Sequence, residues 1–278
     1  NKGEVVRVLE DNKTLQDDIN SLHIKAPEFF SFTTAEGVAL NGYMIKPYDF
    51  DPSKKYPVIM RVYGGPGSQE AKQWYDGFKM MWHQMMAQKG YITVCVDNRG
   101  TALRGRDFRT STYGQLGKYE TNDQIEAAKW LSKQSFIDGN RIGIWGWSYG
   151  GYMAGLCITR GADVFKAAVS VAPVTNWKYY DNIYTERYMG TLETNPNGFD
   201  ANAPMAYADK LQGKYLLIHG TGDDNVHFQN SAEWINALIK NNKQFDLMIY
   251  PDRNHGVSGG NTRYHLYTLM TNFWLENL

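Results

Sequence analysis

Residues 142–151 read Ile-Gly-Ile-Trp-Gly-Trp-Ser-Tyr-Gly-Gly, a short apolar run that leads into the pattern Gly-Trp-Ser-Tyr-Gly at 146–150. The residues that follow, 152–156, favour a helix. A Gly-x-Ser-x-Gly pattern between a strand and a helix is typical of a sharp turn that exposes a nucleophilic serine, because the glycines let the flanking backbones approach closely. We therefore predict that Ser148 is a nucleophile and that the backbone N–H of Tyr149 can donate to an oxyanion.

Two later loops contain the acid and the histidine that such a serine requires. The apolar run at 214–219 opens into a loop with Asp223, and the apolar run at 245–250 opens into a loop with His255. In proteins with this turn the acid and the histidine follow the serine in that order, each on a loop after a later strand. The sequence therefore predicts a triad of Ser148, Asp223 and His255.

Neighbouring residues compete for two of these roles. Asp224 is an alternative acid, but the Asp-x-x-Val spacing that starts at Asp223 favours Asp223. His227 is an alternative base, but it lies only four residues from Asp223, whereas His255 comes from a separate loop. His219 ends an apolar run, where a buried, hydrogen-bonded ring is the ordinary interpretation.

Composition excludes several classes of partner. A chain of 278 residues suits one large domain. Lys plus Arg and Asp plus Glu both number 29, so there is no excess charge to attract nucleic acid. No run approaches the roughly 18 apolar residues of a membrane span. The chain begins with Asn1, and residues 1–9 resemble a strand fragment, so we expect a processed or excised part of a longer protein.

No pattern indicates a cofactor. Cys95 and Cys157 lie in apolar segments and look like small core residues, and nothing supports a disulfide between them. No Cys or His spacing resembles a zinc site, and the glycine-rich segment 64–67 lacks the lysine and following helix of a phosphate loop. We therefore predict no cofactor and no metal.

Hydrophobic periodicity indicates an α/β fold. A helix is expected at 14–22, followed by an antiparallel pair of strands at 29–33 and 38–45. From residue 58 strands and helices alternate, which predicts a mostly parallel sheet with helices on both faces. The expected strands are 58–63, 91–96, 141–145, 167–171, 215–218 and 245–250, and the expected helices are 82–89, 122–133, 149–158, 232–240 and 264–276.

Two long segments show no clear period. Residues 98–119 are rich in Gly and Arg, and a solvated surface is favoured for them over a segment that braces the site. Residues 174–207 contain many aromatic side chains, which pack in a core in most proteins but here follow a strand close to the predicted nucleophile. Ligands bind at this end of α/β sheets, so a role in a pocket weighs as much as a role in packing.

Four motifs carry a family resemblance. They lie at residues 62–69, 146–151, 179–190 and 219–228. With them the chain resembles, over nearly its whole length, the hydrolase domain of the dipeptidyl peptidase IV branch of the prolyl oligopeptidase family. The resemblance implies an α/β-hydrolase fold over residues 1–278 and an N-terminal β-propeller that this chain does not contain.

The resemblance also implies roles for single residues. It makes Ser148 the nucleophile, Asp223 the orienting acid and His255 the base. The phenol of Tyr63 becomes the second oxyanion donor beside the N–H of Tyr149. A pocket for a proline ring and a donor to a substrate carbonyl are assigned to the following residues: Val174, Trp177, Tyr180, Tyr184 and Val226 for the ring, and Asn225 for the carbonyl.

The implied activity is that of a serine exopeptidase, which releases N-terminal dipeptides with proline or alanine before the scissile bond. In this family the propeller supplies the glutamates and arginine that capture the free amino terminus. The resemblance favours an extracytoplasmic location, in the periplasm, the cell envelope or the medium, and it allows a homodimer. A prolyl endopeptidase, an acyl-ester hydrolase with the same triad and a catalytically silent interaction domain remain alternatives.

Overall fold

A single mixed sheet organises the chain, as described by a computed structural model for residues 3–73 and 77–278. Its strands run in the order β1-β2-β4-β3-β5-β6-β7-β8. The pairs β1–β2 and β2–β4 are antiparallel, and all the other pairs are parallel. The predicted parallel sheet with an antiparallel N-terminal hairpin is therefore confirmed. The strands are β1 (Glu28–Thr33), β2 (Ala39–Ile45), β3 (Tyr56–Val62), β4 (Ile92–Asp97), β5 (Ile137–Trp147), β6 (Ala167–Val171), β7 (Lys214–Gly220) and β8 (Asp246–Tyr250).

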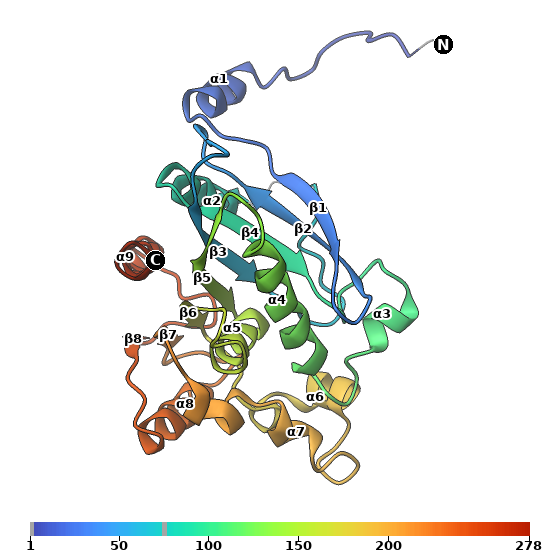
Figure 1. Cartoon of the computed structure of the whole chain (residues 1–278), viewed down its shortest axis with the longest axis vertical. Helices are drawn as coiled ribbons and strands as arrows, with labels where there is room; N and C mark the ends of the chain where they lie inside the picture. The colour runs from blue at the N-terminus through green and yellow to red at the C-terminus, as the bar shows by residue number, and fades with distance from the viewer. Residues whose placement is uncertain (1–2, 74–76) are drawn as a thin grey trace.

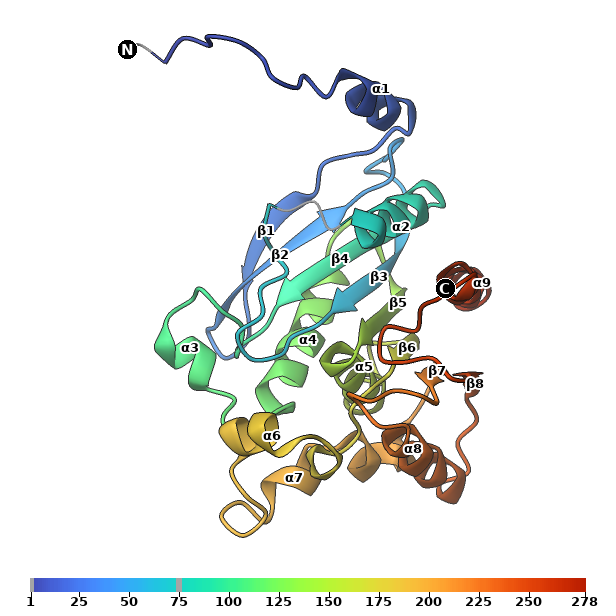
Figure 2. The same cartoon turned by 180° about the vertical axis from the view of Figure 1, so that it is seen from behind.

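Helices cover both faces of the sheet (Figures 1 and 2). One buried cluster joins the sheet to α4, α5 and α8, and a second joins the opposite face to α2 and α9. The helices are α1 (Lys13–Ser21), α2 (Gly77–Gln88), α3 (Arg106–Thr110), α4 (Lys118–Leu131), α5 (Tyr149–Arg160), η1 (Trp177–Tyr179), α6 (Asn182–Met189), α7 (Gly198–Ala201), η2 (Pro204–Lys210), α8 (Gln229–Lys240) and α9 (Thr262–Asn277). Helix α1 projects beyond the end of the sheet (Figure 1).

The central strands are mostly apolar because both of their faces are covered. Every residue of β3 is buried. Val58 and Met60 point into the cluster shared with α4 and α5, whereas Ile59 points into the cluster shared with α2 and α9. Successive side chains of a strand point to opposite faces, so a strand buried on both sides shows no polar alternation.

The structure corrects several expectations. Residues 3–9 are exposed and form no strand, because no other strand lies beside them to supply hydrogen bonds. The segment 98–119 contains α3, and the segment 174–207 contains η1, α6, α7 and the start of η2, so neither is simply irregular. Strand β5 begins at Ile137 rather than 141, because Ile137 pairs with Tyr56 ahead of a register shift. Helix α4 begins at Lys118 rather than 122.

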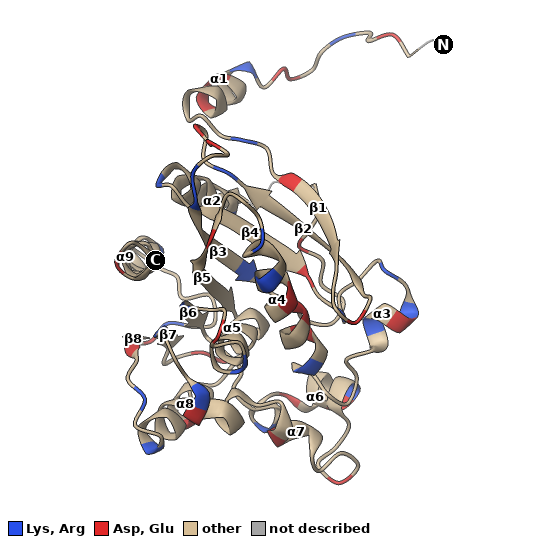
Figure 3. Cartoon of the chain, viewed as in Figure 1, with Lys and Arg blue, Asp and Glu red and all other residues tan. Residues whose placement is uncertain are grey.

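Charged residues of both signs are scattered along the chain, as Figure 3 shows, which agrees with the balanced composition. Cys95 and Cys157 are both buried and free. In the described part of the chain, no helix is long and apolar enough to cross a membrane. The same residues hold no group of three or more His, Cys, Asp and Glu side chains arranged to bind a metal ion.

Candidate active site

The predicted site residues gather at one edge of the sheet. Ser148 follows β5, Val174 lies just past β6, Asp223 follows β7 and His255 follows β8, while Tyr63 follows β3. These five strands are parallel, so their carboxyl ends lie on the same side. This is the edge at which open α/β sheets place their ligands.

Ser148 lies on a strained turn between β5 and α5. Its φ is 61° and its ψ is −119°, a backbone conformation that a residue with a Cβ rarely adopts. Two hydrogen bonds hold it there: the Ser148 N–H donates to the carbonyl of Val171 (2.8 Å), and the Tyr152 N–H donates to the carbonyl of Ser148 (3.0 Å). The side chain makes no cap to the helix. The Ser148 hydroxyl therefore lies at the N-terminus of α5 without accepting a hydrogen bond from the helix backbone.

The glycines on either side of this turn are required by close backbone approach. A Cβ at Gly150 would collide with the carbonyl oxygen of Val62, at the end of β3. A Cβ at Gly146 would collide with the backbone of Gly150 and with the same carbonyl. The Gly-x-Ser-x-Gly pattern thus packs the start of α5 directly against the end of β3.

Asp223 and His255 are joined by a short hydrogen bond. His255 Nδ1 lies 2.7 Å from Asp223 Oδ2. The carboxylate can only accept when ionised, so Nδ1 carries the proton and Nε2 is left with a free lone pair. Burial alone would raise the pKa of Asp223, but hydrogen bonds from His219 and His255 hold it below its usual value. Asp223 is therefore ionised at neutral pH.

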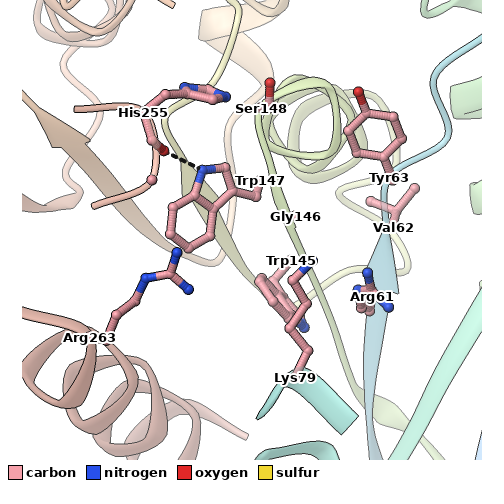
Figure 4. A pocket seen from close by; sticks show the side chains of 11 residues that line it. Arg61, Val62, Tyr63, Lys79, Trp145, Gly146, Trp147, Ser148, His255 and Arg263 are labelled. Carbon is pink, nitrogen blue, oxygen red and sulfur yellow. Dashed lines mark hydrogen bonds between the residues drawn. The ribbon is translucent and has the colours of Figure 1, made fainter. Parts of the chain in front are cut away.

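Ser148 and His255 face the same cavity. They line a hollow of about 250 Å³ together with Tyr63. In Figure 4 the Ser148 hydroxyl lies between the His255 ring and the Tyr63 hydroxyl. The indole N–H of Trp147 donates to the carbonyl of His255 (2.9 Å), so the residue just before the serine holds the backbone of the histidine. The chain thus brings the three residues of the predicted triad to one place.

A second histidine supports the acid. His219 is fully buried, and its Nε2 faces both Asp223 Oδ2 (3.1 Å) and the carbonyl of Val226 (2.8 Å). Two acceptors on one side require the proton on Nε2, so Nδ1 accepts from the Ser231 hydroxyl (2.7 Å). The buried, hydrogen-bonded ring expected for His219 is confirmed. Its contact with Asp223 was not predicted.

Two tyrosines lie where oxyanion donors are expected. Tyr63 is half-buried, and burial raises the pKa of its phenol, which keeps the O–H protonated. Its ring lies 6.0 Å from the ring of Tyr149. The Tyr149 side chain is buried and donates to Glu120 Oε1 (2.7 Å), so only its backbone N–H remains to face a ligand. Glu120, in the first turn of α4, is fully buried, and burial raises its pKa to about 7.

The predicted ring pocket forms an aromatic cluster beside Ser148. The Trp177 ring stacks on Tyr184 (5.5 Å, 24°) and meets Tyr180 edge-on (5.7 Å, 88°). It also lies 5.3 Å from the ring of Tyr149, which connects the cluster to the turn that carries Ser148. The N-cap residue Asp181 accepts from the backbone N–H of Tyr184 (2.9 Å) and so begins α6 at the correct place.

The members of this cluster differ in exposure. Val174, Trp177 and Val226 are buried, whereas Tyr180 and Tyr184 are partly accessible. The Tyr180 hydroxyl donates to Asn225 Oδ1 (2.8 Å). Both lie in a surface cavity of about 640 Å³ with Asp224 and His227, the alternative acid and base. Asp224 and His227 are exposed, and neither is bonded to the Asp223–His255 pair in the part of the chain that the structure describes.

Three residues that position the site were missed by sequence analysis: Trp147, Glu120 and His219. Trp147 binds a residue 108 positions away, and Glu120 binds one 29 positions away. No local pattern records a pair so far apart. The one usable signal was the position of His219 at the end of an apolar strand next to the acid loop.

A partly exposed serine on a strand-to-helix turn, with an Asp–His pair at the same edge of a largely parallel sheet, defines an α/β hydrolase. Comparison with known proteins narrows this class. Residues 77–278 match the model of the prolyl oligopeptidase family of peptidases. Because that match spans most of the chain, the chain belongs to the prolyl oligopeptidase family.

Its relatives are much longer proteins. The chain is 43% identical over 272 residues to the prolyl endopeptidase FAP of Mus musculus, covering 96% of this chain and 35% of that protein. It is 40% identical over 277 residues to dipeptidyl peptidase 4 of Bos taurus, covering 98% and 36%. The crystal structure of Porphyromonas gingivalis dipeptidyl peptidase 4 superposes with a TM-score of 0.94 at 45% identity, covering 98% of this chain and 38% of that one. The chain thus spans about a third of the curated relatives it matches.

Proposed function

We propose that this chain carries the active site of a serine exopeptidase that removes dipeptides with proline or alanine before the scissile bond. The observation that carries the proposal is the 2.7 Å bond between His255 and Asp223, with His255 and Ser148 lining one cavity. Names of relatives support it, since they include dipeptidyl peptidases. The structure of P. gingivalis dipeptidyl peptidase 4 is similar over 98% of this chain.

The proposed reaction proceeds through an ester on Ser148. His255 Nε2 takes the proton of the Ser148 hydroxyl as the oxygen attacks the carbonyl carbon of the scissile bond. The imidazolium is stabilised by Asp223 and gives its proton to the departing amine. Water then attacks the ester and gives a proton to His255, which passes it to the Ser148 oxygen as the acyl bond breaks and the free dipeptide leaves.

The tetrahedral intermediate needs donors for its oxyanion. We assign this role to the Tyr63 phenol and the Tyr149 backbone N–H. The Tyr149 N–H is one of the free donors at the start of α5, where the helix dipole also favours negative charge. The raised pKa of Tyr63 supports a neutral phenol that can donate.

The aromatic cluster is the proposed site of the proline ring. Flat aromatic walls suit a rigid apolar ring, and Trp177, Tyr180 and Tyr184 supply them. Because the Tyr180 hydroxyl occupies Oδ1 of Asn225, that amide presents its NH₂ group, which can hold a substrate carbonyl. The buried Val174 and Val226 set the shape of the wall behind the rings.

A prolyl endopeptidase is the second candidate, because one similar protein is named as such. The two activities differ in whether the substrate needs a free amino terminus. We propose that the groups which bind that terminus lie outside residues 1–278, as the family resemblance implies. The acyl-ester hydrolase and the silent interaction domain are the remaining alternatives.

The test compares Gly-Pro reporter substrates with a free and with a blocked amino terminus, in this chain and in the whole natural protein. We expect turnover of both reporters by the chain, and a strong free-amine preference only in the whole protein, because remote binding energy aligns the scissile bond. A strong preference in the chain alone would instead implicate a nearby acid such as Asp181 or Glu186.

The Ser148→Ala variant is the control for chemistry. It should lose turnover and lose covalent labelling by an organophosphonate probe. Labelling that persists in this variant would contradict the assignment of the nucleophile. Absence of labelling in the unmodified protein would favour the interaction domain.

A further inference from the structure

Cationic side chains line the cavity next to Ser148. The cavity of about 250 Å³ that contains Ser148 and His255 is also lined by Arg61, Lys79 and Arg263. They come from three elements, β3, α2 and α9. In Figure 4 all three lie on the same side of the Ser148 hydroxyl, with Lys79 extending toward Trp145 and Arg263 lying against Trp147.

Arg263 is fixed next to the residues of the triad. Its guanidinium carbon lies 5.2 Å from the centre of the Trp147 ring. The same indole donates to the carbonyl of His255, so a chain of two contacts joins Arg263 to the proposed base. Within the described residues the buried Nε of Arg263 has no hydrogen-bond partner. A buried N–H without an acceptor costs free energy, which an incoming acceptor would recover.

The charges around the cavity do not cancel. Arg61 pairs with Glu70, with 2.5 Å between Nη2 and Oε2. Among residues 3–73 and 77–278, neither Lys79 nor Arg263 forms an ion pair with a carboxylate. The excess of positive charge also affects the buried His83. Burial, and then the charges of Arg61 and Lys79, hold the pKa of its ring well below the usual value. The cavity therefore attracts anions.

The cavity is separate from the aromatic cluster. Trp177, Tyr180, Tyr184 and Asn225 are not among the residues that line it. A substrate bound with its scissile carbonyl at Ser148 extends in two directions. If the acyl part occupies the aromatic cluster, as the proposed function requires, the cationic cavity is within reach of the departing peptide, because Ser148 itself lines it.

We propose that the cavity formed by Arg61, Lys79 and Arg263 binds a carboxylate of the departing peptide and so selects substrates that carry one just after the scissile bond. This inference rests on the proposed function. The carboxylate has two sources, the C-terminus of a tripeptide or the side chain of Asp or Glu in the position after proline. Charge-assisted hydrogen bonds from guanidinium and ammonium groups suit both.

The test uses two matched pairs of substrates with free amino termini. Gly-Pro-Ala is compared with its amide, and Gly-Pro-Glu amide with Gly-Pro-Gln amide, by the release of Gly-Pro in the whole natural protein. The readout is the ratio of kcat/KM within a pair. We expect the charged member to be preferred about tenfold in at least one pair at low salt, and less at high salt, as is usual for partly exposed charges. The pair that responds identifies the source of the carboxylate.

The variant Lys79→Gln/Arg263→Gln should bring the responding ratio close to one, whereas Arg263→Lys should retain most of it. Because each ratio is taken within one variant, a general loss of activity does not affect it. Lys240→Gln, an exposed lysine at the end of α8, is the matched control and should leave the ratio unchanged.

A neutral Gly-Pro reporter distinguishes a failure of the cationic subsite from a failure of the proposed function. If it is cleaved but neither pair shows a preference for the charged member, the cationic subsite is wrong while the proposed function stands. A preference that survives in Lys79→Gln/Arg263→Gln also overturns the assignment. If the neutral reporter is not cleaved at all, the proposed function fails and this inference fails with it.

Discussion

Asp223 uses every lone pair of its carboxylate. Oδ2 meets the rings of His255 and His219, and Oδ1 accepts the backbone N–H groups of Asn225 (3.0 Å) and Val226 (2.9 Å). An amide has only one acceptor atom, so asparagine cannot satisfy both sets of donors. Position 223 therefore requires an ionised carboxylate, which can accept from all four donors.

Asp223→Asn should therefore lower kcat by about 10³–10⁴-fold, because the His255 ring would be held with its proton on the wrong nitrogen. Asp224→Asn is the matched control, since Asp224 is exposed and its loss should cost less than about tenfold. Steady-state kinetics on a Gly-Pro reporter measure both. Equal losses would show that the loop, and not the Asp223 carboxylate, is what the reaction requires.

Glu120 makes stability depend on pH. Burial raises its pKa from 4.5 to about 7, so the folded protein holds a proton that the unfolded chain has lost between these two values. Stability from this group is present below about pH 4.5 and is lost as the pH rises through about 7. The shift corresponds to roughly 3 kcal/mol.

Glu120→Gln removes this titration while keeping an acceptor for the Tyr149 hydroxyl. Relative to the unmodified protein, the variant should gain up to roughly 3 kcal/mol in unfolding free energy between pH 5 and pH 8, because other titrating groups cancel in the difference. Urea unfolding at both pH values measures this, with the exposed Glu193→Gln as the control. Parallel pH curves for Glu120→Gln and the unmodified protein would mean that Glu120 is charged in the folded state.

At the scale of elements, two glycines of α5 differ in how closely other parts of the chain approach them. A Cβ at Gly150 would collide with the carbonyl of Val62 at the end of β3, whereas a Cβ at Gly155 would make only ordinary contacts, the nearest with Pro204 Cβ at 3.5 Å. Helix α5 is buried along almost its whole length, so its start cannot move away from the sheet.

Gly150→Ala should lower the unfolding free energy by about 1–3 kcal/mol or more, because the helix would be forced off β3. Gly155→Ala should instead raise it by about 0.5–1 kcal/mol, since alanine favours a helix interior. Thermal unfolding of the two variants gives the comparison. A harmless Gly150→Ala would show that the contact between α5 and β3 can relax.

The elements of the fold could be predicted because each obeys a local rule. Strand β3 is mostly apolar, since helices cover both of its faces, and Ser148, Asp223 and His255 each follow such a mostly apolar strand. The partners Glu120 and Trp147 could not be predicted, because their contacts depend on how distant elements pack. The short helices α6 and α7 were missed since eight and four residues carry too little periodicity to be seen.

At the scale of the whole molecule, the sheet separates two tasks. Its faces hold the two large buried clusters, and its carboxyl edge holds the polar site, so the stability of the core and the chemistry of the site depend on largely different residues. The two cavities at that edge differ in character, one aromatic and polar, the other cationic. A substrate lying across Ser148 would meet both.

The hydrogen bond from Trp147 to the carbonyl of His255 connects the loop of His255 to β5, a central strand. On heating, this loop should then stay ordered until the sheet itself unfolds. Loss of activity and loss of circular dichroism should follow one temperature curve in the unmodified protein. Trp147→Phe keeps a ring but lacks the donor, so its activity should fail several degrees before its fold, and heat would become a way of inactivating the enzyme without unfolding it.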